Sequence, residues 1–242
     1  MQPILVQLPQ SPWSEKARWA LDHHHVRYIS VEHVPLVYEP LLRLASREAG
    51  RKPTVPMLFD GKHVVRDSFA IARHVDEQGE SEKLVPPAHD AEISLWNDRV
   101  EELMQNARAR LVERIPTSPA ALRDELPSFL RPLGIVLTPL ARLGLGFLAS
   151  KFDTASVSPA ASEAAMASVL EVAQKAIEGG DYLVGGRFSF ADVGLACALD
   201  FVSPHANARH SAAGREVWCE PKLSAAFPGL IAWRDRIVDR HR

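Results

Sequence analysis

The sequence predicts an α+β protein of two domains, with a βαβαββα domain over residues 1–80, a linker at 81–88 and an all-helical domain over 89–242. Two observations predict this division. Short apolar strand patterns alternate with helical patterns in the first part of the chain, whereas the second part has helical periodicity only. Between them, residues 79–88 are polar and contain Pro86-Pro87, which is typical of a linker.

Each element of the first domain has a local signal. Ser11 followed by Pro12 and the acidic Glu15 predicts the start of a helix, because a hydroxyl cap, proline in the first turn and early acid all favour that position. Asp60-Gly61 between two apolar runs predicts a hairpin turn. The expected elements, in order, are a strand at 4–8, a helix at 12–24, a strand at 26–32, a helix at 39–49, hairpin strands at 55–59 and 62–65, and a helix that begins at Asp67-Ser68.

The second domain is predicted from helical spacing and caps. Ser189 and Asp192 are spaced as a capping box that opens an apolar helix. Residues 116–159 are less regular, and we expect their prolines at 127, 132 and 139 to break helices. In residues 89–114, one face is apolar at steps of three and four, formed by Ile93, Trp96, Val100, Leu103, Ala107 and Leu111.

Composition and charge exclude several classes of function. The 242 residues carry a net charge of −2, which gives no electrostatic support for coating nucleic acid. Two cysteines, Cys197 and Cys219, are too few for a disulfide framework or an all-cysteine zinc site, and they fit a reducing, cytoplasmic compartment. The N-terminus has no basic region typical of a signal peptide, and the apolar residues 132–150 contain Arg142, so we expect no membrane span.

Two other signals are given structural interpretations. The run His23-His24-His25 is not expected to bind a metal, because consecutive helical residues point about 100° apart and do not converge on one ion. Cys197 lies in an apolar helical stretch and is expected to be a small core residue rather than a nucleophile. No metal is therefore predicted.

Three segments in order resemble the serine-type glutathione S-transferases. Residues 11–21 are similar to the active-site helix of that family, residues 54–58 and 66–71 to its glutathione-binding strand and helix, and residues 181–192 to its capping-box segment. The closing helix at 227–233 is also similar. The resemblance implies a thioredoxin-like first domain, a helical-bundle second domain, a homodimer, a glutathione site on the first domain and a site for an apolar substrate between the two.

The activity that the resemblance implies is transfer of the glutathione sulfur to an electrophilic, apolar small molecule. Dehalogenation, isomerisation and peroxide reduction use the same thiolate, and a non-catalytic protein that binds a ligand or partner is a further alternative. A thiol–disulfide oxidoreductase is disfavoured, because Ser11 stands where such enzymes have a cysteine, and serine cannot form a mixed disulfide.

The thiol of glutathione must lose its proton to act as a nucleophile. The amino end of the first helix favours an anion, and Ser11 matches the family's serine, whose hydroxyl donates to the sulfur. Ser14, one turn further on, is a second candidate. The alternative for Ser11 is a plain helix cap. Trp13 is expected to face the glutathione and the acceptor substrate.

The remaining predicted contacts hold the peptide parts of glutathione. By resemblance, Pro56 is a cis-proline, so that the backbone of Val55 pairs with the cysteinyl part like an added strand. Ser68 suits the γ-glutamyl carboxylate and Asp67 its ammonium, although an isolated Asp-Ser is also a common helix cap. Lys52, or its neighbour Arg51, is a candidate for the glycyl carboxylate.

The segment 116–160 matches no part of the family that can be placed. Its apolar stretch from Leu133 to Phe147 is a candidate wall or lid for the acceptor pocket. Packing in the core or in a dimer is the alternative, and it is the one we favour from sequence.

Overall fold

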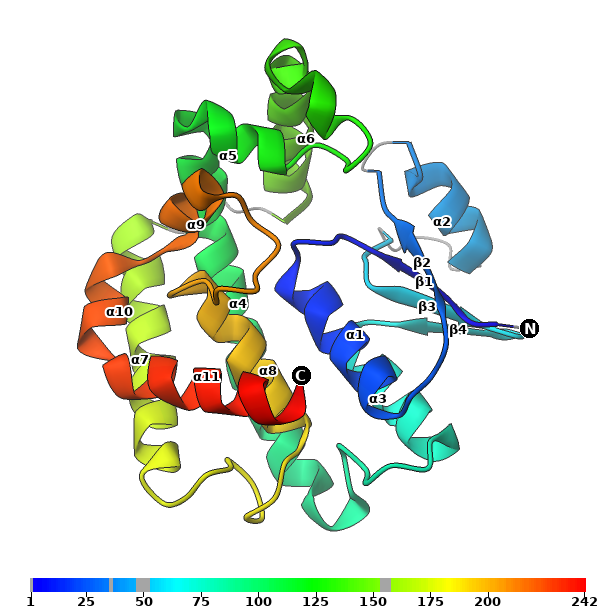
Figure 1. Ribbon diagram of the computed structural model, residues 1–242, viewed down its shortest axis with the longest axis vertical. Coiled ribbons are helices and arrows are strands. Elements are labelled where there is room, and N and C mark those ends of the chain that lie inside the picture. The colour runs from blue at the N-terminus through cyan, green and yellow to red at the C-terminus, as the bar shows by residue number, and fades with distance from the viewer. Residues whose placement is uncertain (1, 35–36, 47–52, 153–157) are drawn as a thin grey trace. The chain divides into compact units, whose positions relative to one another are not determined.

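The computed structural model (Figure 1) describes residues 2–34, 37–46, 53–152 and 158–242. The chain divides into two compact units, one of Met1–Asp90 together with Arg242, and one of Ala91–His241. Each unit is described by itself below.

The first unit is a four-stranded sheet in the order β2-β1-β3-β4 with helices on both of its faces. β1 pairs in parallel with β2 and antiparallel with β3, and β3 forms an antiparallel hairpin with β4. This confirms the predicted thioredoxin-like βαβαββα domain. The elements are β1 (Ile4–Gln7), α1 (Pro12–His23), β2 (Ile29–Glu32), α2 (Glu39–Ser46), β3 (Met57–Asp60), β4 (His63–Arg66) and α3 (Ser68–Gln78).

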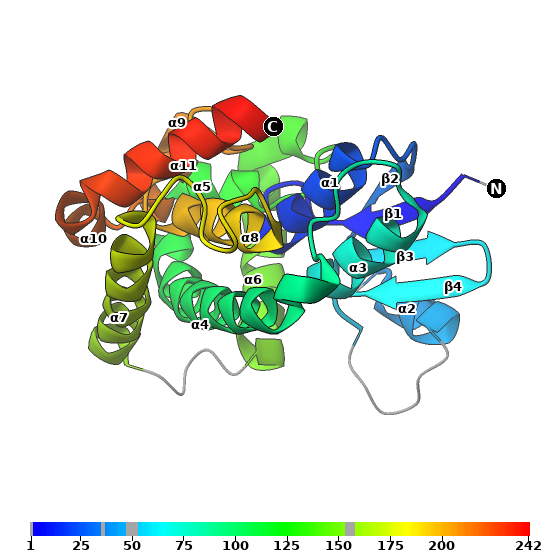
Figure 2. The same cartoon turned by 90° about the horizontal axis from the view of Figure 1, so that it is seen from below.

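The two central strands, β1 and β3, supply buried residues to both faces of the sheet, whereas the residues of β2 and β4 are exposed or half-buried. Val6 of β1 stands opposite Met57 of β3, and both pack with Leu42 of α2 in one cluster. The neighbouring pair, Leu5 and Leu58, is also buried and points to the other face, where α1 and α3 pack side by side (Figure 2). A single layer of strands therefore anchors the start of α1 and the start of α3.

Two strand starts differ from the sequence expectation by more than one residue. β2 begins at Ile29 rather than at residue 26, because the chain first closes α1: the His25 N–H donates to the Asp22 carbonyl and the Val26 N–H to the Leu21 carbonyl. His25 has a φ of 53° in this turn, which is a left-handed conformation. β3 begins at Met57 rather than at residue 55, because Pro56 has no N–H to offer the ladder.

The second unit is built of helices, as predicted. α8 is buried along its whole length and lies at the centre of the packing, with Gly194 of α8 close to Val100 of α4. The predicted apolar face of α4 is confirmed, since all six of its named side chains are buried. The main helices are α4 (Asp90–Arg114), α5 (Pro119–Asp124), α6 (Thr138–Phe152), α7 (Pro159–Ile177), α8 (Phe190–Ala198), α9 (Ala212–Trp218), α10 (Pro221–Ala226) and α11 (Pro228–His241), with short 3-10 turns that include η3 (Arg131–Leu137).

The capping box at the start of α8 is confirmed. Asp192 is fully buried and accepts hydrogen bonds from the Ser189 N–H at 2.8 Å, the Ser189 hydroxyl at 2.9 Å and the Leu183 N–H at 2.8 Å. Burial disfavours its charged form more than these bonds favour it, and so raises the pKa of Asp192 to about 6. Its role is to join the loop before α8 to the helix start.

The prediction for Pro139 is wrong. This proline does not break a helix but lies in the first turn of α6, where its missing N–H costs no intrahelical bond. Cys197 is buried in α8, which confirms its assignment to the core. Among the described residues, no helix is both long and apolar enough to cross a membrane.

Candidate functional site

The sheet register brings three of the predicted site segments to one edge. Val6 near the end of β1 pairs with Met57 at the start of β3, and Met57 pairs with Arg66 at the end of β4. The chain therefore leaves β1 toward Ser11, enters β3 from Val55-Pro56 and leaves β4 toward Asp67-Ser68, all at the same edge. Three adjacent strands thus present these residues as neighbours.

Ser11 stands at the cap position of α1 but does not cap the helix. Its backbone is extended, with φ −76° and ψ 125°, and its hydroxyl makes no hydrogen bond to the first turn. Backbone groups close the turn instead: the Ser11 N–H donates to the Leu8 carbonyl at 3.1 Å, and the Glu15 N–H donates to the Ser11 carbonyl at 2.9 Å. The half-buried hydroxyl is therefore not used by the helix, in contrast with the plain-cap alternative.

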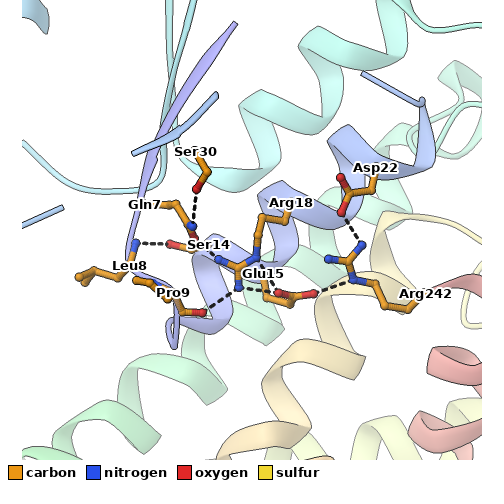
Figure 3. A network of polar contacts seen from close by, with 9 residues as sticks. All are labelled: Gln7, Leu8, Pro9, Ser14, Glu15, Arg18, Asp22, Ser30 and Arg242. Carbon is orange, nitrogen blue, oxygen red and sulfur yellow. Dashed lines mark hydrogen bonds and ion pairs between the residues drawn. The ribbon is translucent and has the colours of Figure 1, made fainter. Parts of the chain in front are cut away.

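Ser14 is placed differently. It is fully buried, and its hydroxyl oxygen accepts the Leu8 N–H at 3.1 Å (Figure 3). This bond ties the first turn of α1 back to the end of β1 and uses the Ser14 side chain within the loop. Of the two predicted serines, Ser11 is the one whose side chain is free of such a bond to the loop.

Arg18 organises the loop that carries Ser11, a role that was not predicted from the sequence. Its guanidinium is buried and donates to the Gln7 side chain, to the Pro9 carbonyl at 3.0 Å and to the Glu15 carboxylate at 2.8 Å (Figure 3). Gln7 in turn donates to the Ser30 hydroxyl of β2 at 2.8 Å. A charged residue within an apolar helical face, seven positions after Ser11, was the only signal of this role in the sequence.

The charges beside the amino end of α1 are balanced. Burial alone would raise the pKa of Glu15, but the guanidiniums of Arg18 and Arg242 together hold the pKa of that carboxyl below its ordinary value. Arg242 groups with this unit and donates to Glu15 at 2.7 Å as well as to Asp22 (Figure 3). The ionised Glu15 is thus neutralised, and it does not cancel the positive potential of the helix start.

The bond between Val55 and Pro56 is a cis peptide bond, so that prediction from the resemblance is confirmed. Pro56 is buried, Val55 is half-buried and Thr54 is exposed. Val55 therefore stands one residue ahead of β3, at the sheet edge next to the β1–α1 loop.

Asp67 is the N-cap of α3, and it has a left-handed backbone with φ 59°. Its Oδ1 accepts the Phe69 N–H at 2.9 Å and the Ala70 N–H at 2.8 Å. The common cap interpretation therefore accounts for one carboxylate oxygen, while Oδ2 has no hydrogen bond within the described part of the chain. Ser68, the first residue of α3, is buried beside it.

Three further predictions concern Trp13, the pair Arg51 and Lys52, and the apolar segment from Leu133 to Phe147. Trp13 is half-buried in the first turn of α1. Lys52 and Arg51 lie outside the described residues. Core packing is wrong for much of the segment from Leu133 to Phe147, because Leu133, Val136, Leu140 and Leu143 are exposed.

The three consecutive histidines do not converge on one ion. The His24 ring is buried and bonds to Asp76 Oδ1 at 2.6 Å, while the His23 ring bonds to the Glu82 carbonyl at 2.7 Å. Across residues 2–34, 37–46, 53–152 and 158–242, no group of three or more histidine, cysteine or acidic side chains is arranged to hold a metal.

The fold and this edge define a protein of the thioredoxin-like class, with a cis-proline ahead of β3 and an all-helical second domain. Residues 5–83 match the family model for the glutathione S-transferase N-terminal domain, and residues 139–241 match that for the C-terminal domain. The expectation that residues 116–160 match no part of the family is therefore wrong for 139–160. The chain belongs to the glutathione S-transferase family. A search of the curated proteins found no match.

Solved structures share the fold at low sequence identity. A glutathione S-transferase domain-containing protein of Marinobacter aquaeolei has a TM-score of 0.64 at 18% identity, with 98% of each chain covered. A rice glutathione S-transferase in complex with glutathione has a TM-score of 0.62 at 17% identity, over 98% of this chain and 87% of that one. A Methylobacterium radiotolerans enzyme in complex with glutathione sulfonate has a TM-score of 0.60 at 14% identity, over 98% and 90%.

Proposed function

We propose that this protein is a glutathione transferase that uses the glutathione thiolate to attack electrophilic, apolar small molecules. In the reaction the sulfur forms a bond to an electrophilic carbon, and a leaving group such as chloride departs with its electron pair. The observation that carries the proposal is the Ser11 hydroxyl, which stands at the amino end of α1 and makes no bond to the helix.

Ser11 is the proposed donor to the thiolate. A free thiol has a pKa of about 8.5, and each unit of lowering requires about 1.4 kcal/mol of preference for the anion. A hydrogen bond to a charged group contributes about 1.5–3 kcal/mol, and the helix start adds to it. Together these terms are large enough to ionise a substantial part of the thiol near neutral pH.

The rest of the same sheet edge suits the peptide parts of glutathione. Val55 supplies backbone N–H and C=O groups for the cysteinyl residue. The N–H and the hydroxyl of Ser68, at the start of α3, suit the γ-glutamyl carboxylate. The Oδ2 atom of Asp67 is left for the γ-glutamyl ammonium, and Lys52 stays the proposed partner of the glycyl carboxylate.

The test is the rate with glutathione and chlorodinitrobenzene as a function of pH, for the unmodified protein and for Ser11→Ala. We expect kcat/KM near pH 6.5 to fall about 10- to 100-fold in the variant, which is the loss of one charged hydrogen bond. The apparent pKa of the kcat/KM profile should rise by about one to two units.

Ser14→Ala is the matched control, because it removes the other hydroxyl of the same helix turn. It is expected to lose some stability through the Leu8 N–H but to leave the pKa of the profile in place. Equal profiles for Ser11→Ala and the unmodified protein would overturn the role of Ser11. Tight glutathione binding without turnover of several acceptors would instead favour the non-catalytic alternative.

The predicted homodimer, the cytoplasmic location and Trp13 as a wall of the glutathione site stay proposals. They follow from the family resemblance and from composition. The choice among conjugation, dehalogenation, isomerisation and peroxide reduction depends on the acceptor, and a panel of acceptors at fixed glutathione would decide it.

A further inference from the structure

The segment between α5 and α7 combines exposed apolar side chains with charge of one sign. Residues 126–152 contain no aspartate or glutamate and three basic residues, Arg131, Arg142 and Lys151, whereas the whole chain carries a net −2. The same segment holds a concentration of large exposed apolar side chains: Phe129, Leu133, Val136, Leu140 and Leu143, of which Val136 is 82% exposed. Large apolar side chains exposed so close together in the chain are typical of an interaction site.

α6 has one packed face and one open face. Ala141 and Leu145 are buried and attach the helix to its unit, where it packs with α5 (Figure 1). Leu140 and Leu143 are three residues apart and so lie on a common face, and both are exposed. A Cβ atom built on Gly144 would meet no atom within 4 Å, which shows open space next to the two leucines.

The length of α6 limits what this face can enter. The helix has 15 residues, and at 1.5 Å per residue it is about 22 Å long, against about 30 Å for the hydrocarbon core of a bilayer. It is therefore too short to span a bilayer, and Arg142 is exposed on the helix. A short helix with an apolar face and an exposed basic residue is suited to lie in the plane of a lipid headgroup layer.

We propose that η3 and α6 form a peripheral docking surface for an anionic lipid bilayer. The apolar side chains of Leu133, Val136, Leu140 and Leu143 enter the boundary between headgroups and acyl chains. Arg142, which is exposed on α6, meets the negative lipid headgroups, and residues 126–152 contain no acidic residue to oppose it. This proposal does not depend on the catalytic role of Ser11.

Charge favours a lipid surface over a second copy of the chain. A two-fold contact on this face would place the same acid-free, positively charged segment against itself, and like charges across an interface are repulsive. An anionic bilayer meets the same segment with the opposite sign. Packing against an apolar acceptor molecule alone would leave the exposed Arg142 without a counter-charge.

The experiment is co-sedimentation of the full chain with vesicles at low salt. One set of vesicles is pure phosphatidylcholine, and the other contains roughly a third of phosphatidylglycerol, which supplies the anionic surface. We expect the protein to sediment with the anionic vesicles and not with the neutral ones. The double variant Leu140→Ser/Leu143→Ser should lower the partition coefficient at least tenfold, and Phe129→Trp should report insertion by a blue shift of its fluorescence.

Matched controls test whether position matters. Leu41→Ser/Leu44→Ser removes two exposed leucines from α2 of the first unit and should leave vesicle binding unchanged. Arg142→Gln should weaken binding several-fold, whereas Arg236→Gln, also exposed in the second unit, should not.

Three outcomes would overturn the proposal. One is the absence of binding to either kind of vesicle. Another is binding that Leu140→Ser/Leu143→Ser and Leu41→Ser/Leu44→Ser reduce equally. The third is that the α6 variant leaves vesicle binding unchanged but alters the molar mass in light scattering or the KM for the acceptor. That result would assign the face to a second copy or to the substrate. Loss of transferase activity in Ser11→Ala with retained vesicle binding would separate the two proposals.

Discussion

A buried charged side chain such as Arg18 is costly unless its partners are well placed. Arg18 meets this condition with a carboxylate, a carbonyl and a side-chain amide, and these partners come from both sides of the loop that carries Ser11. Its planar guanidinium can reach all three groups together, which a single ammonium cannot. We therefore interpret Arg18 as a positioning residue for the serine rather than as a catalytic one.

Arg18→Lys tests this interpretation because it keeps the positive charge but removes the planar guanidinium that donates to three groups. We expect kcat/KM for glutathione and chlorodinitrobenzene to fall about tenfold, since a loosened loop misplaces Ser11, while the KM for the acceptor changes little. The apparent pKa of the rate profile should rise as it does in Ser11→Ala, but by less. Arg27→Lys, an exposed arginine of the same unit, is the control. A rate equal to that of the unmodified protein, with an unchanged thermal transition, would contradict the positioning role.

The contact of His210 with Trp218, close to α5 and α9, makes the free energy of unfolding depend on pH. His210 is buried against Trp218, with ring centroids 4.1 Å apart, just ahead of α9. Burial lowers the pKa of His210 to about 4, with Asp124 acting against the shift and Arg131 and Arg215 adding to it. The folded state therefore holds this ring neutral at pH values where the unfolded chain would protonate it.

The sign of the effect follows from the lowered pKa. Between the ordinary value near 6.5 and about 4, the unfolded chain binds more protons, so the free energy of unfolding falls as the pH is lowered through this window. The full loss is on the order of 3 kcal/mol. His210→Phe keeps a ring against Trp218 that does not titrate. Between pH 7 and 4, its free energy of unfolding in denaturant melts should fall by about 3 kcal/mol less than that of the unmodified protein. His25→Asn changes an exposed histidine and should give the same pH dependence as the unmodified protein. If the free energy of unfolding of His210→Phe also changed with pH as it does in the unmodified protein, the prediction would be contradicted.

The elements that were predicted well are those whose ends are encoded locally. The helix start at Ser11-Pro12, the capping box at Ser189, the Asp60-Gly61 turn and the spacing of α4 depend on neighbouring residues only, so one sequence suffices to predict them. The start of β2 depends instead on how α1 closes, and the partners of Arg18 depend on the sheet register. The apolar stretch from Leu133 to Phe147 was recognised from composition, but composition could not tell a buried stretch from an exposed one, because both kinds contain apolar residues.

The candidate site also combines features that are encoded locally with features that depend on the fold. Ser11, Val55-Pro56 and Asp67-Ser68 were found because each is a local motif at an element boundary. Their common position follows only from the pairing of β1 with β3 and of β3 with β4, which the sequence does not display. The unused Ser11 hydroxyl and the buried Ser14 hydroxyl are likewise properties of the folded loop.

At the scale of the whole molecule, stability depends on contacts that join distant parts of the chain. Glu220, at the N-cap of α10, is buried and accepts hydrogen bonds from Arg110 at 2.7 Å and from Arg114 at 2.6 Å, both on α4. Arg110 also donates to Glu163 of α7 at 3.1 Å and to the Pro159 carbonyl at 2.7 Å. Helices α4, α7 and α10 thus meet at Arg110, whose carboxylate partners lie 53 and 110 residues further along the chain.

Removing that negative charge should destabilise the helical unit strongly. In Glu220→Gln two arginines lose their shared counter-charge, and breaking a buried pair costs about 3–5 kcal/mol; because Arg114 is 30% exposed, we expect about 2–4 kcal/mol. Glu163→Gln removes a carboxylate that is 31% exposed and touches the same Arg110, so its cost should stay below about 1 kcal/mol. Denaturant melts followed by circular dichroism measure both. Equal losses would mean that burial at Glu220 adds nothing to the pairing, and that α4, α7 and α10 are held together by their apolar faces alone.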